Sequence, residues 1–404
     1  MSQTGLRRSV GPALLTFYGL GNIVGAGIYV LLGEVVGVAG TTAPLAFLLS
    51  LAVAGLSALT YGELAARFPL AAGEAAYLER AFHLPPLSLF VGLLITAAGV
   101  VSSAALARGF AGYLGVLLPV ADVWAILLLV TALGAVCIWG IDLSMRAAAV
   151  LTVIEVVGLL VVIAGLGEGY SALTQRAGEL VPAAEPAAWA GLWVGAFLAF
   201  YAFIGFEDMV KVAEEVRRPA HDLPRAILGA LGGAALLYLV LAVGAVLALD
   251  PASLAGSEAP LAVIYQETTG RGGALITLFG LVAAVNGVLA QIIMASRMLY
   301  GLAGEGRLPA FLGRVHPRRR TPLPATVAVA VVVALLALAF PVKGLAGMTS
   351  ALILAVFAAV NLALWRLRRR DPRPGYTLTP RWGPPVALAA TLLLAAGGLF
   401  SLLR

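Results

Sequence analysis

Long apolar runs separated by short polar segments dominate the chain. The runs recur at about 20 residues, the length that an α-helix needs to cross the hydrocarbon core of a bilayer. The polar segments between them are too short for a soluble domain. The pattern therefore predicts one all-α domain over residues 1–404, a polytopic membrane bundle of about eleven transmembrane helices. We expect these near residues 10–32, 44–67, 86–116, 122–140, 146–167, 188–210, 226–249, 273–303, 323–341, 345–367 and 383–402.

Composition and charge support a membrane location. Hydrophobic residues make up 61% of the chain and charged residues 11%, whereas soluble domains carry roughly 45–50% and about 25%. The net charge is +6, and a cytoplasmic N-terminus places most basic residues in cytoplasmic loops. With arginine favoured over lysine, we expect a prokaryotic plasma membrane protein in contact with lipid. The main basic clusters are Arg314, Arg318, Arg319, Arg320 and Arg366, Arg368, Arg369, Arg370.

Several classes of function are disfavoured by what the sequence contains. Cys137 is the single cysteine, which argues against a disulfide framework or a cysteine metal cluster. His83, His221 and His316 lie far apart in predicted loops, and the chain has no phosphate-binding loop. The basic clusters lack interleaved aromatic residues, so lipid and topology explain them better than nucleic acid. We therefore expect no enzymatic activity, no cofactor, no metal and no nucleic-acid partner.

The first apolar run contains three glycines in the stretch GNIVGAGIYV, residues 21–30. Each glycine costs a helix interior about 1 kcal/mol relative to alanine. An interruption at Gly25 and Gly27 would leave a half-helix whose free N–H groups and positive end point into the membrane, a site suited to a carboxylate. Close packing of two helices is the alternative, because small residues four apart also serve that purpose. The glycines alone do not separate the two.

The sixth run favours an interrupted helix over close helix packing. In FLAFYAFIGFEDMVKVAEEVRRP, residues 197–219, Gly205 follows an aromatic run and precedes a charged segment. Broken helices at equivalent positions of two halves indicate an inverted-repeat transporter with its site near the midplane. We therefore expect a 5+5 repeat, with repeat one over about 10–167, repeat two over about 188–367, and an extra helix at 383–402.

The chain resembles the amino acid–polyamine–organocation (APC) superfamily of transporters, which have the leucine-transporter fold. The resemblance covers nearly the whole chain and implies a secondary transporter of amino acids that works by alternating access. Family members generally have twelve spans, so the eleven expected here leave monomer and homodimer both open. The motifs that carry the resemblance are GNIVGAGIY (21–29), YGELAARFPLAAGEAAYLERAF (61–82), FYAFIGFEDMVKVAEEVRRPAHDLPRAI (200–227) and ASRMLYGLAGEGRLP (295–309).

The resemblance also implies where the substrate binds. The substrate carboxylate would lie at the first break, and its ammonium at carbonyls of the second break. Tyr201 matches the position of an aromatic lid, and Gln291 matches a substrate-facing position. Ser102 and Ser103 are weaker candidates, because membrane serines often bond their own backbone. The expected binding residues are Val24, Gly25, Ala26, Gly27 and Ile28 at the first break, and Phe200, Tyr201, Ala202 and Ile204 at the second, with Phe203 and Gly205 in the wall.

These wall residues include no carboxylate for a basic side chain and no arginine for an acidic one, so we expect neutral amino acids as substrates. Phe203 has a second interpretation as an ordinary core aromatic. Three charged residues after the second break, Glu207, Asp208 and Lys211, are candidates for an inner gate. A solvated helix face at the membrane edge is the alternative for them.

Glu155 lies in the middle of the fifth run, in LTVIEVVGLL. A charge at that depth costs roughly 2.5–3.5 kcal/mol or more, so an intramembrane carboxyl is a functional candidate by default. Many relatives carry a lysine here, and the glutamate reverses that charge. We expect Glu155 to bind and release a proton during uptake. The alternatives are a sodium site, or a permanently neutral acid bonded to the eighth helix. Obligate amino acid exchange and a non-transporting sensor remain alternatives for the whole protein.

Overall fold

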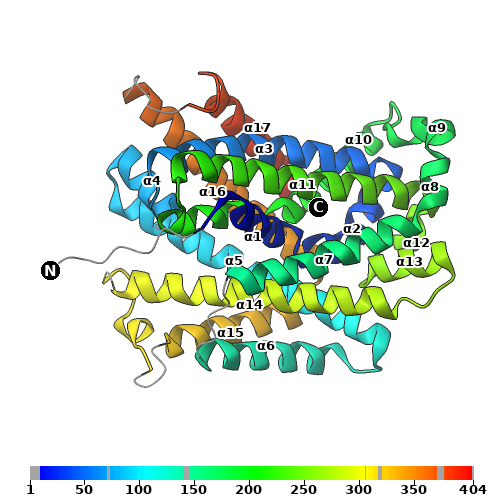
Figure 1. The fold of residues 1–404 in the computed structure, drawn as a ribbon, viewed down its shortest axis with the longest axis horizontal. Helices are drawn as coiled ribbons and strands as arrows, with labels where there is room; N and C mark the ends of the chain where they lie inside the picture. Colours follow the sequence, from blue (N-terminus) through cyan, green and yellow to red (C-terminus); the bar gives the residue numbers. More distant parts are fainter. Residues whose placement is uncertain are drawn as a thin grey trace.

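The protein folds into a bundle of helices, most of which run side by side along its longest axis (Figure 1). The computed structural model describes residues 10–70, 73–139, 145–304, 306–316, 321–370 and 377–402, with the backbone alone for residues 26, 145–148, 401 and 402. Within these ranges every named element is helical. The first nine residues and Arg318, Arg319 and Arg320, which entered the predicted topology, lie outside the described residues.

The first half of the chain forms the elements α1 to η2. They are α1 (Pro12–Val24), α2 (Ala26–Ala39), η1 (Gly40–Thr42), α3 (Ala43–Arg67), α4 (Gly73–Phe82), α5 (Pro85–Leu117), α6 (Asp122–Trp139), α7 (Met145–Gly165), α8 (Gly167–Ser171), α9 (Leu173–Arg176) and η2 (Ala177–Leu180).

The second half forms the elements α10 to α17. They are α10 (Pro186–Phe200), η3 (Tyr201–Phe203), η4 (Phe206–Glu215), α11 (Pro219–Ala248), α12 (Pro251–Leu254), α13 (Pro260–Thr269), α14 (Ala274–Gly304), η5 (Ala310–Gly313), α15 (Leu323–Ala339), α16 (Val342–Arg370) and α17 (Gly383–Leu402).

The predicted membrane bundle is confirmed. Each of the predicted apolar runs falls on one helix or on a broken helix of the structure. Eight segments of the described chain are long and apolar enough to cross a membrane, and the shorter apolar helices Pro12–Val24, Ala149–Gly165 and Leu323–Ala339 accompany them. The boundaries of the two repeats stay a prediction.

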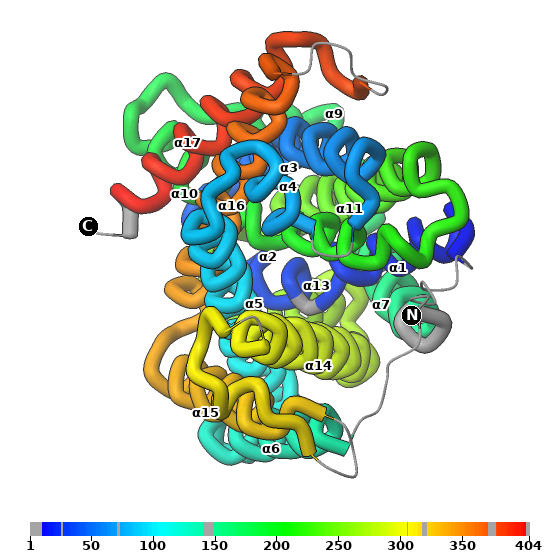
Figure 2. Tube along the Cα trace, turned by 90° about the vertical axis from the view of Figure 1, so that its left-hand side faces the viewer, coloured from blue at the N-terminus to red at the C-terminus, as the bar shows by residue number. Residues whose placement is uncertain are grey.

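The first interrupted helix, formed by α1 and α2, enters the middle of the bundle. Figure 2 shows α2 in the interior and α1 running from it toward one edge, with α3 and α11 on one side and α5 and α14 on the other. Helix α14 packs along α5, and α11 packs along α3. Helices α6 and α15 form one edge, while α17 packs against α16, α10 and α3. The first break therefore lies inside the bundle, between these pairs of helices.

Aromatic side chains fill the core next to the second break. Phe200 and Phe206 both contact the ring of Phe357, with ring centroids 5.7 and 5.2 Å apart. Phe203 contacts Tyr238 with centroids 5.3 Å apart. All of these side chains are buried. Such edge and tilted contacts stabilise the irregular backbone at this break from several neighbouring helices.

Candidate substrate site

The first span is interrupted at Gly25, as predicted. The Gly25 N–H still donates to the Gly21 carbonyl at 3.0 Å, as in a helix, but the Gly25 ψ of −164° then takes the chain out of helical geometry and ends α1. Helix α2 begins directly afterwards at Ala26. The first N–H groups of a helix have no acceptor within it. Together with the positive end of the helix dipole, they form a site for an anion inside the protein.

The second break centres on Gly205, which joins η3 to η4. Its φ of +126° is a conformation that favours glycine. A Cβ on Gly205 would lie 2.4 Å from the carbonyl oxygen of Asn22, so a side chain would collide with the last turn of α1. The Glu207 carboxylate accepts the Gly205 N–H at 2.8 Å. The two breaks therefore touch, and glycine at 205 is what allows it.

Tyr238, on α11, connects the two breaks. Its buried hydroxyl lies 2.8 Å from the carbonyl oxygen of Ile23 and 3.1 Å from that of Ala202. A hydroxyl has one proton to donate, so it bonds one of these carbonyls fully and the other weakly. The sequence gives little sign of this role, because Tyr238 is a single tyrosine in an apolar helix.

A cavity lies between the breaks. Its wall combines residues of the first break with polar side chains from four other elements. The residues that form it include Gly21, Asn22, Ile23, Gly25 and Gly27 at the first break, Tyr201 and Ile204 at the second, Asp208 on η4, Ser102 on α5, and Asn286 and Gln291 on α14. The Tyr201 hydroxyl is 2.9 Å from the Ser102 hydroxyl.

Six of the expected binding residues line this cavity: Gly25, Gly27, Ser102, Tyr201, Ile204 and Gln291. Seven other expected residues line neither this cavity nor the one described next: Val24, Ile28, Ser103, Phe200, Ala202, Phe203 and Gly205. The side chain of Ala26 lies outside the described part of the chain. Phe203 packs against Tyr238 and Phe47, as a core aromatic does. The side chains that meet the cavity are thus fewer than expected.

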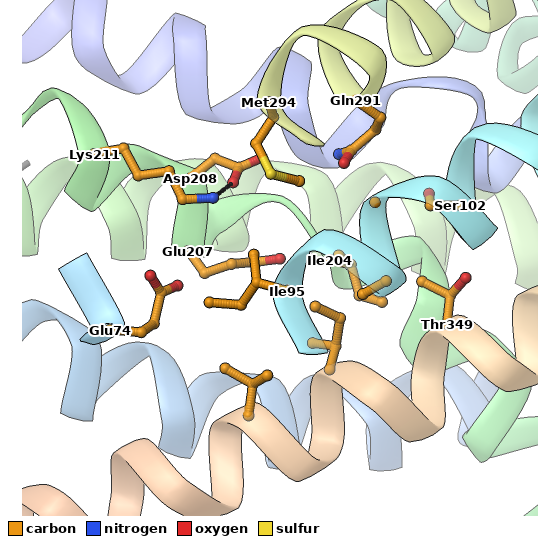
Figure 3. A pocket seen from close by; sticks show the side chains of 14 residues that line it. Glu74, Ile95, Ser102, Ile204, Glu207, Asp208, Lys211, Gln291, Met294 and Thr349 are labelled. Atoms are coloured by element: carbon orange, nitrogen blue, oxygen red, sulfur yellow. Dashed lines mark hydrogen bonds and ion pairs between the residues drawn. The ribbon is translucent and has the colours of Figure 1, made fainter. Parts of the chain in front are cut away.

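A second cavity continues from the first toward α4 (Figure 3). The two cavities share Ser102, Ile204, Asp208 and Gln291 in their walls. Apolar residues such as Ile95 and Met294 line one part of it, and charged residues line another. The charged residues are Glu74, Glu207, Asp208 and Lys211.

The three inner-gate candidates lie together in this wall. The Lys211 ammonium is 2.5 Å from the Asp208 carboxylate, and Glu207 is 5% exposed. They therefore do not form the solvated helix face that was the alternative. Asp208 also lines the first cavity, so the expectation that the wall holds no carboxylate is wrong. That expectation failed because η4 turns its first residues toward α5 and α14.

Glu74 reaches the same cavity from α4, a helix outside the candidate membrane spans. Its carboxylate accepts the Tyr61 hydroxyl at 3.3 Å. Burial raises the pKa of the Glu74 carboxyl above its usual value, and the nearby Lys211 charge acts in the opposite direction. Protonation of Glu74 would change the charge of the wall opposite η4.

Glu155 is fully buried in α7. Its Oε1 accepts the side-chain N–H of Asn286, on α14, at 2.9 Å, and its backbone carbonyl accepts the Tyr29 hydroxyl at 2.6 Å. Its Oε2 has no hydrogen-bond partner among the residues that the structure describes. Helix α14 is the eighth predicted span, so this bond is the contact that the alternative of a neutral acid bonded to the eighth helix requires. Asn286 was missed from the sequence, where its signal is an isolated amide in a long apolar run that also contains Gln291.

Comparison with known proteins agrees with this architecture. The family model described as amino acid permease matches residues 13–402. An uncharacterized transporter of Mycobacterium tuberculosis is 31% identical over 96% of this chain and 86% of its own length. Cationic amino acid transporter 2 of Arabidopsis thaliana is 30% identical over 91% of this chain and 61% of its own. A branched-chain amino acid permease of Bacillus subtilis is 27% identical over 91% and 82%.

Proposed function

Since this chain belongs to the amino acid permease family, we propose that it carries amino acids through the two-break site by alternating access. It is a multi-pass membrane protein. We place it in a bacterial plasma membrane with a cytoplasmic N-terminus, as a monomer or a homodimer. Transport is the activity that we assign to it, with no chemical change of the substrate.

The meeting of the two breaks at one cavity carries this proposal. Gly25 and Gly27 bring the positive N-terminal end of α2 to the cavity wall. Tyr201 and Ile204 bring the opposite, carbonyl-rich end of α10 and η3 to the same space. An α-amino acid carries a carboxylate and an ammonium on adjacent atoms. The two helix ends offer the complementary partial charge to each.

We propose neutral amino acids as the substrates. Asp208 brings a negative charge to the cavity, but its ion pair with Lys211 offsets that charge within the wall. The relatives are named for different substrates: the Arabidopsis thaliana transporter for cationic amino acids and the Bacillus subtilis permease for branched-chain amino acids. In the cavity between the two breaks the charged lining residue is Asp208, and its pairing with Lys211 supports branched-chain amino acids. A substrate with a basic side chain would have to compete with Lys211 for Asp208 or reach Glu74 and Glu207 in the second cavity.

We propose a proton at Glu155 as the coupling ion. This carboxyl is fully buried beside the first break and has an unpartnered oxygen. A buried carboxyl that gains and loses a proton as the site opens to each side would couple transport to a pH gradient. Exchange of one amino acid for another is the competing mechanism.

Uptake into liposomes tests these proposals together. The purified protein is reconstituted, and uptake of radiolabelled leucine, alanine or arginine is followed with an acidic exterior, with sodium or choline as the salt. We expect uptake of leucine or alanine into empty liposomes, driven by the pH gradient and unaffected by sodium. Uptake only into liposomes preloaded with amino acid would establish exchange. Binding without flux would establish a sensor.

A further inference from the structure

Asn286 lies between the buried carboxyl of Glu155 and the substrate cavity. Its side-chain nitrogen donates to Glu155 Oε1 at 2.9 Å, and the same side chain forms part of the cavity wall beside Gly25 and Gly27. Glu155 itself is fully buried and lines neither cavity. Asn286 is therefore the polar side chain that touches both the proposed proton site and the proposed substrate site.

The chemistry of an amide makes such a position sensitive to protonation. An ionised carboxylate only accepts hydrogen bonds, so the amide must turn its NH₂ group toward it. A protonated carboxyl also has an O–H to donate, and the amide oxygen can accept it. A half-turn of the amide about its terminal bond exchanges the two groups without moving either helix. The group left facing the cavity changes from an oxygen to an NH₂.

We propose that Asn286 converts the protonation of Glu155 into a change in the hydrogen-bonding character of the cavity wall. When Glu155 gains a proton, its new O–H donates to the Asn286 oxygen. The Asn286 NH₂ then faces the cavity near Gly25 and Gly27, where it donates to the substrate carboxylate. Loss of the proton reverses the turn and presents an oxygen to that carboxylate. Proton and substrate thus favour each other's binding, as symport requires.

This inference rests on the proposed function, and it makes Asn286 a positioning residue for the coupling step. The titratable groups that face Glu155 from neighbouring helices are the phenols of Tyr29 on α2 and Tyr238 on α11, and phenols are neutral below about pH 9. Helix α1 has no acidic or basic residue in Pro12–Val24. Arg297, on α14, is three turns of helix from Asn286, about 16 Å along its axis. Tyr265 and Glu267 are on α13, which packs against α7 at Gly165, the last residue of that helix, and not at Glu155 in its middle.

Magnetic resonance on the intact protein tests the amide turn directly. The chain has three asparagines, Asn22, Asn286 and Asn361, so labelling asparagine with ¹⁵N gives three side-chain amide signals. Those of Asn22 and Asn361 are assigned by single substitution, which leaves the third to Asn286. We expect the Asn286 signal to shift between low and high pH in the parent and to stay fixed in Glu155→Gln. A signal that is the same at both pH values in the parent would overturn the inference.

Affinity measurements test the consequence. For leucine, we expect the parent to bind about tenfold more tightly at about pH 5.5 than at about pH 8, within the usual range of coupling between two sites. Asn286→Ala should still bind leucine, with less than about a twofold change over the same range. Gln291→Ala is the matched control. It removes another amide from the wall, so it should weaken binding but keep the tenfold dependence on pH.

Infrared difference spectra separate failure of this inference from failure of the proposed function. The carbonyl stretch of a protonated Glu155, identified by its loss in Glu155→Gln, should appear on acidification in both the parent and Asn286→Ala. If it appears in both and Asn286→Ala keeps the tenfold change, Asn286 has no coupling role and proton binding at Glu155 stands. If it is missing from the parent, Glu155 does not titrate and both proposals fail.

Discussion

Replacing Gly27 with alanine tests the anion site at the start of α2. Gly27 lines the cavity in the first turn of α2. A Cβ there would lie 3.3 Å from Ala202 Cα and 3.5 Å from two ring atoms of Tyr201. These contacts are tight, but a shift of a few tenths of an ångström relieves them. Alanine also favours the helix over glycine by about 0.5–1 kcal/mol, so we expect the variant to fold.

The expected loss concerns the substrate carboxylate. A methyl group at 27 would occupy the space through which the carboxylate approaches the free N–H groups. A hydrogen bond to a charged group contributes about 1.5–3 kcal/mol, and 1.4 kcal/mol corresponds to a tenfold change in Kd. Binding of leucine should therefore weaken roughly 10- to 100-fold. Leucinamide, which lacks the carboxylate, should bind the parent weakly and lose little more in Gly27→Ala.

Equilibrium binding of radiolabelled leucine to the purified protein measures this effect, with leucinamide as a competitor. Gly232→Ala is the matched control, because a Cβ at Gly232, on α11, meets no atom within 4 Å. Its affinity for leucine should equal that of the parent. Unchanged leucine binding in Gly27→Ala, or an equal loss for leucine and leucinamide, would refute the assignment of the carboxylate to this helix end.

Three further predictions concern the lid, the coupling residue and the inner cavity. Tyr201→Ala should slow uptake at least tenfold, because the ring that covers Gly27 is lost. Tyr201→Phe should have a smaller effect, since it loses only the bond to Ser102. Equal uptake by Tyr201→Ala and the parent would refute the role of Tyr201 as a lid. Glu155→Gln should bind leucine yet lose the acceleration of uptake by an acidic exterior, and acceleration like that of the parent would exclude this carboxyl as the proton site. Because burial raises the pKa of Glu74, the folded state favours its protonated form, and the stability this gives at low pH is lost as pH rises through the folded-state pKa. The Tm of Glu74→Gln relative to the parent should therefore increase from acidic to alkaline pH, and a constant difference would contradict this linkage.

The sequence predicts the helices and their breaks because both depend on local signals. Apolar length identifies a span wherever it lies, and a glycine inside such a span has a cost that a function must offset. Gly25 and Gly205 could therefore be found without knowing their neighbours. The resemblance to the family placed Gln291 at a substrate-facing position and Ser102 was a weaker candidate, and both line the cavity.

Contacts between distant helices could not be predicted in this way. Asn286 and Tyr238 are isolated polar residues in largely apolar helices, and the sequence does not say which face of the helix meets a partner. Their bonds to Glu155 and to the carbonyls of both breaks depend on how α7, α11 and α14 pack. Asp208 was expected only at a gate, because its place in the cavity wall follows from how η4 turns after Gly205.

An experimental structure with bound leucine tests the central claim most directly, since that claim concerns where the substrate lies. We expect the carboxylate against the N–H groups that open α2, at Gly27 and its neighbours. The ammonium should lie against carbonyls between Phe200 and Ile204, with the leucine side chain toward Gln291. Leucine bound only in the cavity beside Glu74 and Lys211, with the space between the two breaks empty, would contradict the account.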